Sequence, residues 1–188
     1  MEGRGFGYLL GLGANLGAVR LNLTAATTQL ESLGRIERVS SLYLTAPREL
    51  PDQPDFLNAA LLLETDLEPV TLLAALKGIE AMLGRDPGGE RYGPRLIDLD
   101  ILVIPGRCLA LPDITVPHPK LHERRFVLEP LAELDPDLRP WAGCDDLRVD
   151  VTVRDLLELV EDQEVRRIEG PSWAGIIGPG GMGVSFSP

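Results

Sequence analysis

Two acids inside an apolar stretch are the residues of this chain best suited to chemistry. Asp98 and Asp100 lie in residues 96–104, LIDLDILVI, which read as a buried strand. Since successive side chains of a strand point to opposite faces, the odd-numbered residues form an apolar face and both acids lie on the other, about 6–7 Å apart. Like charges at this spacing repel, and each raises the pKa of the other carboxyl. Mg²⁺ would relieve the repulsion, because it prefers oxygen ligands and is commonly held by one or two carboxylates together with substrate phosphates.

The polar loop at residues 85–95 precedes these acids and supplies three arginines, Arg85, Arg91 and Arg95. A solvated strand face, on which the acids simply pair with arginines, would account for the same residues. Phosphoryl transfer is the alternative, because it depends on positioning and on neutralising phosphate charge. The chain has no GxxxxGK[ST] sequence, and residues 11–17, GLGANLG, do not form a GxGxxG pattern, so P-loop and Rossmann nucleotide sites are excluded.

Two histidines, His118 and His122, are four residues apart, which on a helix would suit a zinc pair. Pro117 and Pro119 flank the first of them and disfavour a helix at this point. The sequence therefore favours a polar contact from His118, for example with a phosphate, over a zinc site.

A second kind of site is indicated by Phe56 and Asn58, which lie two residues apart and so on one face of a predicted strand. Ordinary strand patterning also explains this pair. The functional alternative is a flat heterocycle stacked on Phe56, with the Asn58 amide hydrogen-bonded to its edge. Ser40 and Ser41 have no histidine and acid beside them in the sequence, so a catalytic serine is not predicted.

The composition of the 188 residues fits one globular domain, since 44% are hydrophobic and 25% are charged. A net charge of −11 argues against a nucleic-acid partner, although the stretch 85–128 is nearly neutral and suits a small anionic ligand. No apolar run reaches the roughly 18–20 residues of a membrane helix, so no membrane partner is expected. Cys108 and Cys144 lie far apart and outside any CxxC pattern, which predicts reduced thiols and a cytoplasmic location.

Apolar periodicity and Gly/Pro-rich breaks predict a β-α-β-β-α-β order. Strands are predicted at residues 6–12, 36–45, 56–65 and 96–104, and helices from Asn15 or Gly17 to residue 33, at 69–83 and at 153–160. The predicted fold class is α+β, a ferredoxin-like antiparallel sheet with helices on one face and a C-terminal extension. The other face is left for loops and a site. We expect a single domain over residues 1–170 and a flexible Gly/Pro-rich tail over 171–188.

Four parts of the sequence together make the chain resemble one family. They are GLGANLG at residues 11–17, YLTAP and DQPDFLNAAL between residues 43 and 61, RYGPRLIDLDIL at 91–102 and VPHPKLHERRFVLEPLAEL at 116–134. In this order and spacing they are similar to the 6-hydroxymethyl-7,8-dihydropterin pyrophosphokinases of folate biosynthesis. The resemblance runs from about Tyr8 to Asp137.

This resemblance implies transfer of the β,γ-pyrophosphate of ATP to the hydroxymethyl group of the pterin, with release of AMP. In that family the acid pair holds two Mg²⁺ ions that bridge the ATP phosphates, which assigns the metal to Asp98 and Asp100. The first of these acids would also lie near the pterin hydroxyl and help to deprotonate it. The residues made catalytic by the resemblance are Arg85, Arg95, Asp98 and Asp100.

The resemblance also divides the remaining site residues between the two substrates. The pterin would contact Thr45, Ala46, Phe56, Asn58 and Phe126, with its ring between the two phenylalanines. ATP would contact Glu80, Arg91, Ile101, Thr115, His118 and Arg124. We expect a monomer with ATP and hydroxymethyldihydropterin as its partners.

Both polar loops depart from the family pattern. Residues 46–55 carry Arg48 and Glu49 where the family often has a glycine, and residues 85–91 carry Pro-Gly-Gly where some members have another basic residue. We expect both loops to close over the substrates and exclude water. A ferredoxin-like small-molecule sensor without catalysis, and a Mg²⁺-dependent nuclease or phosphoesterase that uses the same acids, are the alternatives.

Overall fold

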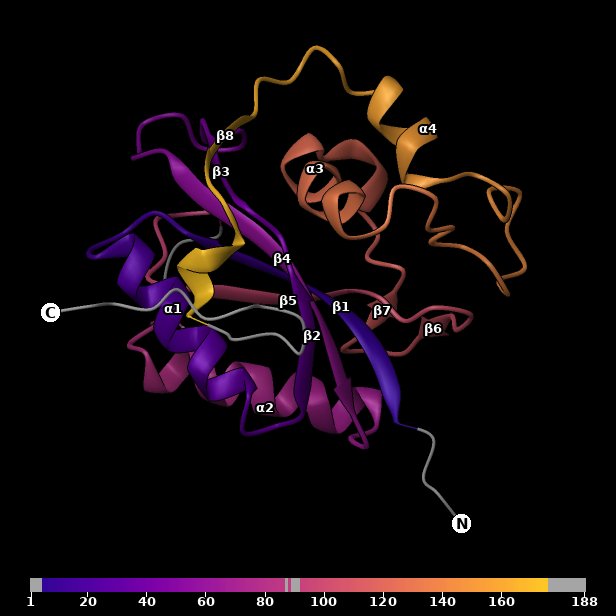
Figure 1. Ribbon diagram of the computed structural model, residues 1–188, viewed down its shortest axis with the longest axis horizontal. Coiled ribbons are helices and arrows are strands. Elements are labelled where there is room, and N and C mark those ends of the chain that lie inside the picture. Colours follow the sequence, from indigo (N-terminus) through magenta and orange to yellow (C-terminus); the bar gives the residue numbers. More distant parts are fainter. Residues whose placement is uncertain (1–4, 87, 89–91, 176–188) are drawn as a thin grey trace, which may run out of the picture.

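A six-stranded antiparallel sheet forms the centre of the protein, in a computed structural model that describes residues 5–86, 88 and 92–175 (Figure 1). The strands run in the order β5-β1-β4-β3-β8, and β2 also pairs with β4. Their bounds are β1 Phe6–Ala14, β2 Arg35–Val39, β3 Leu42–Thr45, β4 Phe56–Thr65, β5 Asp98–Val103 and β8 Arg166–Glu169. The antiparallel mixed α/β architecture agrees with the prediction.

The strand predicted at residues 36–45 is broken into β2 and β3 at Ser40 and Ser41. Val39 lies opposite Leu61 and Tyr43 lies opposite Asn58, so the segment between β2 and β3 contains one residue more than β4 does. This is the count of a β-bulge. The backbone N–H of Ala60 donates to the buried Ser40 hydroxyl at 2.9 Å, which satisfies a donor at the break.

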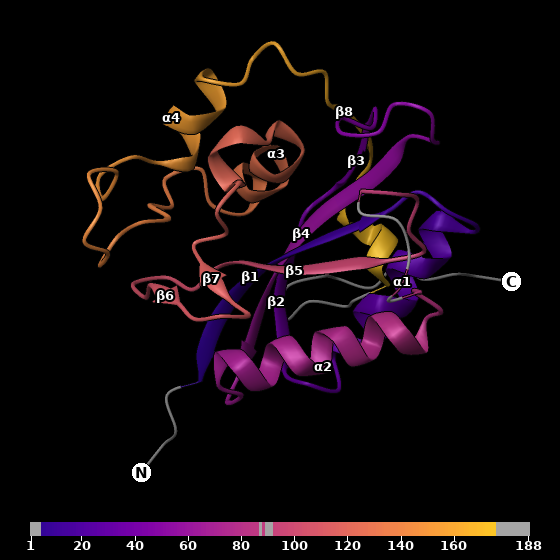
Figure 2. The ribbon, with the colours of Figure 1, turned by 180° about the vertical axis from the view of Figure 1, so that it is seen from behind.

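Two helices, α1 Val19–Leu30 and α2 Pro69–Met82, cover one face of the sheet (Figure 2). Their buried leucines pack on alternate residues of the strands, for example Leu10 and Leu12 of β1 and Leu99 of β5. The first helix begins at Val19, later than predicted, because Asn15 is buried and has another function, described below.

The opposite face carries a helix of its own, so the prediction of helices on one face is wrong. Helix α3, Arg125–Leu134, packs against β4, with the short α4, Val153–Glu158, behind it (Figure 1). The reason lies in the sheet, since Leu9, Ala60 and Leu102 present a second apolar surface that must be covered. Part of the C-terminal extension therefore completes the core.

Cys108 and Cys144 are joined in a disulfide with a Cα–Cα distance of 5.5 Å, so the prediction of reduced thiols from their separation in sequence is wrong. The bond ties the segment before the small hairpin of β6, Leu109–Ala110, and β7, Thr115–Val116, to the chain that follows α3. In the described residues no helix is both long and apolar enough to cross a membrane.

The first residues of the expected flexible tail are ordered, which corrects that prediction for Pro171–Ala174. They form the 3₁₀ helix η2, and the Trp173 side chain is buried between α1 and the sheet at 1% exposure. Its indole N–H donates to the Ser40 carbonyl at 2.8 Å. A large aromatic ring with a satisfied donor is enough to anchor a Gly/Pro-rich segment. Residues 176–188 lie outside the described residues.

Candidate active site

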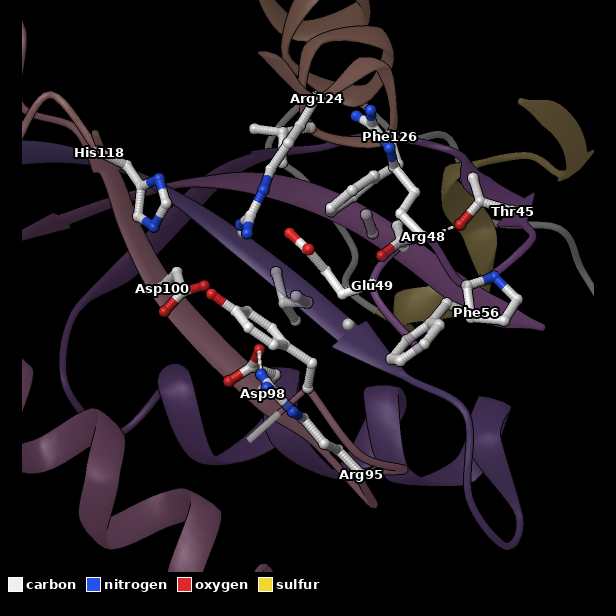
Figure 3. A pocket seen from close by; sticks show the side chains of 18 of the residues that line it. Thr45, Arg48, Glu49, Phe56, Arg95, Asp98, Asp100, His118, Arg124 and Phe126 are labelled. Atoms are coloured by element: carbon white, nitrogen blue, oxygen red, sulfur yellow. Dashed lines mark hydrogen bonds and ion pairs between the residues drawn. The ribbon is translucent and has the colours of Figure 1, made fainter. Parts of the chain in front are cut away.

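A cavity of about 240 Å³ lies on the face of the sheet that α3 shares, between β1, β4, β5 and the start of α3. Its floor is bare at β1, because Gly13 lies between Asp98 of β5 and Asn58 of β4, and Gly11 lies beside Asp100. A methyl group at Gly13 would come within 3.3 Å of the Asn58 carbonyl oxygen Oδ1. The two glycines thus leave one continuous space between two chemically different ends (Figure 3).

The first end is charged and holds both acids of β5, on the same face of the strand as the alternation predicts. Asp98 is paired with two arginines: Arg85 Nη1 lies 2.6 Å from its Oδ1, and Arg95 contacts its Oδ2. The Asp100 carboxylate accepts no hydrogen bond from the described part of the chain. Burial, together with the neighbouring charge of Asp98, raises the pKa of Asp100 to about 6.

A buried glutamate holds this end together from beneath. Glu80 Oε1 accepts the backbone N–H of Leu99 at 2.7 Å and lies 2.9 Å from Lys77 Nζ and 2.6 Å from Arg85 Nη1. Arg85 thereby bridges Glu80 and Asp98. Glu80 itself does not line the cavity, so here it acts on β5 and on Arg85.

His118 and Arg124 form a wall of this end (Figure 3). The His118 backbone N–H donates to the Leu102 carbonyl at 2.8 Å, which attaches the segment to β5. Burial, and then the positive charge of Arg124, lower the pKa of His118 to about 4. The imidazole is therefore neutral near pH 7. Its Nδ1 accepts the Lys120 backbone N–H at 3.2 Å, so Nε2 carries the proton and can act as a donor.

The second end is flat and nearly uncharged. Phe56 of β4 and Phe126 of α3 project into it from two sides (Figure 3). Asn58 Nδ2 donates to Thr45 Oγ1 at 2.8 Å, which fixes the amide and leaves its Oδ1 toward Gly13. Together with Ala46, these residues form a slot whose polar groups are already oriented.

The comparisons with known proteins agree with this geometry. A family model described as 7,8-dihydro-6-hydroxymethylpterin-pyrophosphokinase (HPPK) matches residues 9–136. The chain belongs to this family. The 2-amino-4-hydroxy-6-hydroxymethyldihydropteridine pyrophosphokinase of Pseudomonas aeruginosa is 45% identical over 130 residues, covering 68% of this chain and 80% of that protein. The protein of the same name from Synechocystis is 39% identical over 157 residues, covering 82% and 76%.

Some relatives of this pyrophosphokinase are longer. The mitochondrial folate synthesis bifunctional protein of Pisum sativum is 48% identical over 128 residues, which cover 67% of this chain and 24% of that protein. The structure of Plasmodium falciparum HPPK-DHPS with pteroate superposes with a TM-score of 0.64 at 17% identity, covering 85% of this chain and 43% of that one. The chain spans less than half of these two proteins, and the structural likeness shows the fold alone.

Three expected ATP contacts of the pyrophosphokinase, Glu80, Ile101 and Thr115, do not line the cavity. The Ile101 side chain is buried in the core on the opposite face of β5, and Thr115 lines a separate cavity beside Trp141. Arg91 lies outside the described residues. The His122 ring lies edge-on to the Trp141 ring, and the described residues contain no group of three or more potential His, Cys, Asp or Glu metal ligands.

Sequence reasoning missed Asn15, which connects the two polar loops. Its side-chain Nδ2 donates to Gln53 Oε1 at 3.0 Å and to the Pro54 carbonyl at 2.9 Å, and its Oδ1 accepts the Arg95 N–H at 2.8 Å. The only signal in the sequence was an asparagine at the Gly-rich end of a strand, and the prediction treated it as a possible start of the first helix. In the fold it sets the entry of both loops into the site.

The loop 46–55 is also fastened over the cavity by residues that sequence reasoning had noted only as departures from the family. Arg48 donates to the Glu123 carbonyl at 2.6 Å, and Glu49 lies 3.3 Å from Lys120 Nζ. Lys120 in turn contacts the Tyr92 hydroxyl at 3.3 Å. In Figure 3 Glu49 lies between the two ends of the cavity.

Proposed function

We propose that this pyrophosphokinase transfers the β,γ-pyrophosphate of ATP to the hydroxymethyl group of 6-hydroxymethyl-7,8-dihydropterin, giving the pterin diphosphate and AMP in folate biosynthesis. The observation that carries the proposal is the single cavity in which a flat aromatic slot adjoins a pair of strand-borne acids across the bare Gly13 backbone. A heterocycle in the slot would present a short substituent to a phosphate chain at the acids.

In this proposal the pterin ring stacks between Phe56 and Phe126, and the fixed Asn58 amide recognises its edge. Thr45 and Ala46 supply further contacts from the end of β3. The triphosphate extends along Asp98 and Asp100 toward His118 and Arg124. By analogy with the family, Glu80, Arg91, Ile101 and Thr115 complete the nucleotide contacts, with Ile101 acting through its backbone.

The acids fit Mg²⁺, and we propose two ions shared between them and ATP. Both donors are carboxylates on a rigid strand, and the Asp100 carboxylate has no hydrogen-bond donor among the described residues that would compete with a cation. Two protein ligands leave most coordination positions to phosphate oxygens and water, as Mg²⁺ sites commonly do. Bound Mg²⁺ would neutralise phosphate charge and acidify a coordinated hydroxyl.

In the proposed transfer, side chains of the protein position the reacting atoms and balance their charges. The hydroxymethyl oxygen attacks the β-phosphorus in line, the bond from that phosphorus to the α,β-bridging oxygen breaks, and AMP leaves. Asp98 accepts the hydroxyl proton. Arg85 and Arg95, which neutralise Asp98 here, would turn to the phosphoryl oxygens as negative charge develops there.

The loops 46–55 and 85–95 are proposed to seal the site and limit ATP hydrolysis by water. Hydrogen exchange tests this directly. With a non-hydrolysable ATP analogue, Mg²⁺ and pterin all present, the amides of both loops should gain protection, and unchanged exchange would contradict closure.

A coupled assay for AMP release, with and without hydroxymethyldihydropterin, tests the reaction itself. Release that requires the pterin supports the proposal. A binding protein without catalysis would release no AMP, and a phosphoesterase or nuclease would hydrolyse its substrate without pterin.

We also propose a ferredoxin-like topology for the sheet, because β1 lies between β5 and β4 as two interleaved βαβ units would place it. Residues 1–170 are proposed as one catalytic domain, to which the packed helix η2 also belongs, and the protein is proposed as a monomer. Sedimentation would test the monomeric state.

We also propose a cytoplasmic location, which the proposed use of ATP supports. The redox state of Cys108 and Cys144 in cells would test it.

A further inference from the structure

We propose that Glu133 is a positioning residue for the pterin slot, an inference that rests on the proposed function. It lies outside the cavity, on α3, and none of the residues expected from the family includes it. Its side chain joins the two elements that carry opposite walls of the slot.

Four contacts define the site around Glu133. Its Oε2 accepts the Ser41 backbone N–H and the Tyr43 hydroxyl, both at 2.8 Å. Its Oε1 accepts the Ser41 hydroxyl at 2.8 Å and lies 3.5 Å from Arg167 Nη2 of β8. Both carboxylate oxygens are thus held by donors from the edge of the sheet, in a partly buried setting where such bonds are strong.

The helix side of this connection leads directly to the slot. Phe126 and Glu133 are seven residues apart on α3, close to two turns, so they lie on the same face of the helix. That face meets the sheet. A shift or rotation of α3 at Glu133 would therefore move Phe126 relative to β4.

The strand side leads there as well. Tyr43 and Thr45 are two residues apart on β3, so they lie on the same face of the strand. Thr45 holds the Asn58 amide, and Tyr43 lies opposite Asn58 in the β3–β4 register. Glu133 thereby fixes the helix that carries Phe126 to the strand that carries Thr45, which sets the width of the slot.

The ordered C-terminal segment takes part in the same network. Arg167 Nε donates to the Ser41 hydroxyl at 2.7 Å, while Trp173 of η2 donates to the neighbouring Ser40 carbonyl. The β2–β3 break is therefore held from two sides, by α3 and by the C-terminal segment. This gives β8 and η2 a function in the site that the sequence does not suggest.

The variant Glu133→Gln tests the proposal, because it keeps the side-chain size and removes the charge. We expect the KM for hydroxymethyldihydropterin to rise about tenfold, while the KM for ATP changes less than twofold. Glu129→Gln is the matched control on the same helix, since Glu129 is paired with Arg125 at 2.8 Å and is not bonded to β3. Both KM values should be unchanged in this control.

If Glu133→Gln does not fold well enough to be purified, Tyr43→Phe provides a second test, because it removes only one of the donors to Glu133. It should raise the pterin KM about threefold. A lower melting temperature with both KM values unchanged in these variants would show a purely structural role and overturn the proposal. Equal rises of both KM values would also contradict it. Failure of the wild type to release AMP would instead overturn the proposed function, which separates the two tests.

Discussion

The two ends of the cavity differ in how complete they are. At the slot, Asn58 is already bonded to Thr45, and Phe56 and Phe126 are in place. At the charged end, Asp100 has a raised pKa and Asp98 is shared between two arginines. The shape of the slot is set by packing and by hydrogen bonds within the protein. The charged end instead holds two neighbouring carboxylates, whose charges a bound cation would balance.

This difference has a physical reason. Packing and hydrogen bonds alone can orient two aromatic rings and one amide, because none of these groups carries a charge that must be balanced. Two adjacent carboxylates are stable only when cations or protons balance them. We therefore expect changes at the charged end to affect the chemical step and changes at the slot to affect pterin binding.

The largest effect is expected at the charged end. Asp100→Ala should lower kcat for AMP release by about 10³-fold, because it removes a proposed ligand of the Mg²⁺ that would neutralise the developing phosphate charge. The melting temperature should stay within a few degrees, since the Asp100 carboxylate makes no hydrogen bond with the described residues. Asp113→Ala, an exposed acid outside the cavity, is the control. Near-normal Mg²⁺-dependent turnover in Asp100→Ala would rule out the metal assignment.

A smaller and different effect is expected at the slot. Phe126→Ala should raise the pterin KM by about 10- to 100-fold, the size expected for losing one stacking partner. The ATP KM should change little, as measured by steady-state kinetics with each substrate varied. Phe126→Leu keeps apolar bulk without a flat ring, so its pterin KM should lie between those of the wild type and Phe126→Ala. A loss confined to kcat would contradict the division between the two ends.

The boundary between the ends can be tested at Gly13. Gly13→Ala places a methyl group 3.3 Å from Asn58 Oδ1, so the amide must give way. We expect about a fivefold loss of kcat/KM for the pterin, at the low end of overpacking effects. Gly78→Ala is the matched control, since nothing lies within 4 Å of a methyl group there. A Gly13→Ala enzyme with wild-type kinetics would mean that no substrate crosses this point.

The smallest expected effect is the pH dependence of the stability of the metal-free protein. The pKa of Asp100 is about 6 in the folded state against an ordinary value of 3.8, so between these values the folded state holds a proton that the unfolded state has lost. Stability should therefore fall as pH rises from about 4 to 6. Asp100→Asn should reduce this decline in urea unfolding experiments. Identical pH profiles for the two proteins would contradict the raised pKa.

Much of the site could be predicted because it depends on local alternation. The shared face of Asp98 and Asp100 follows from the period of a strand, and the pairing of Phe56 with Asn58 on one face follows in the same way. The cavity also brings Thr45, Ala46, Arg95, His118 and Arg124 to these residues, as the family resemblance leads one to expect.

The features that the sequence did not predict share a different cause. The second helical layer, the break at Ser40 and Ser41, the disulfide and the buried Trp173 all join residues far apart in the chain. Asn15 and Glu133 likewise act on partners 34 or more residues away. No window of sequence contains both partners of such contacts.

The sequence by itself determined the order of the longer strands and of α1 and α2, the acid pair and its face, and the family, because these depend on periodicity and on short motifs. Only the tertiary structure decided which face of the sheet receives α3, and so which groups close the slot. That choice follows from the apolar surface of Leu9, Ala60 and Leu102, which three separate strands assemble and which must be removed from water.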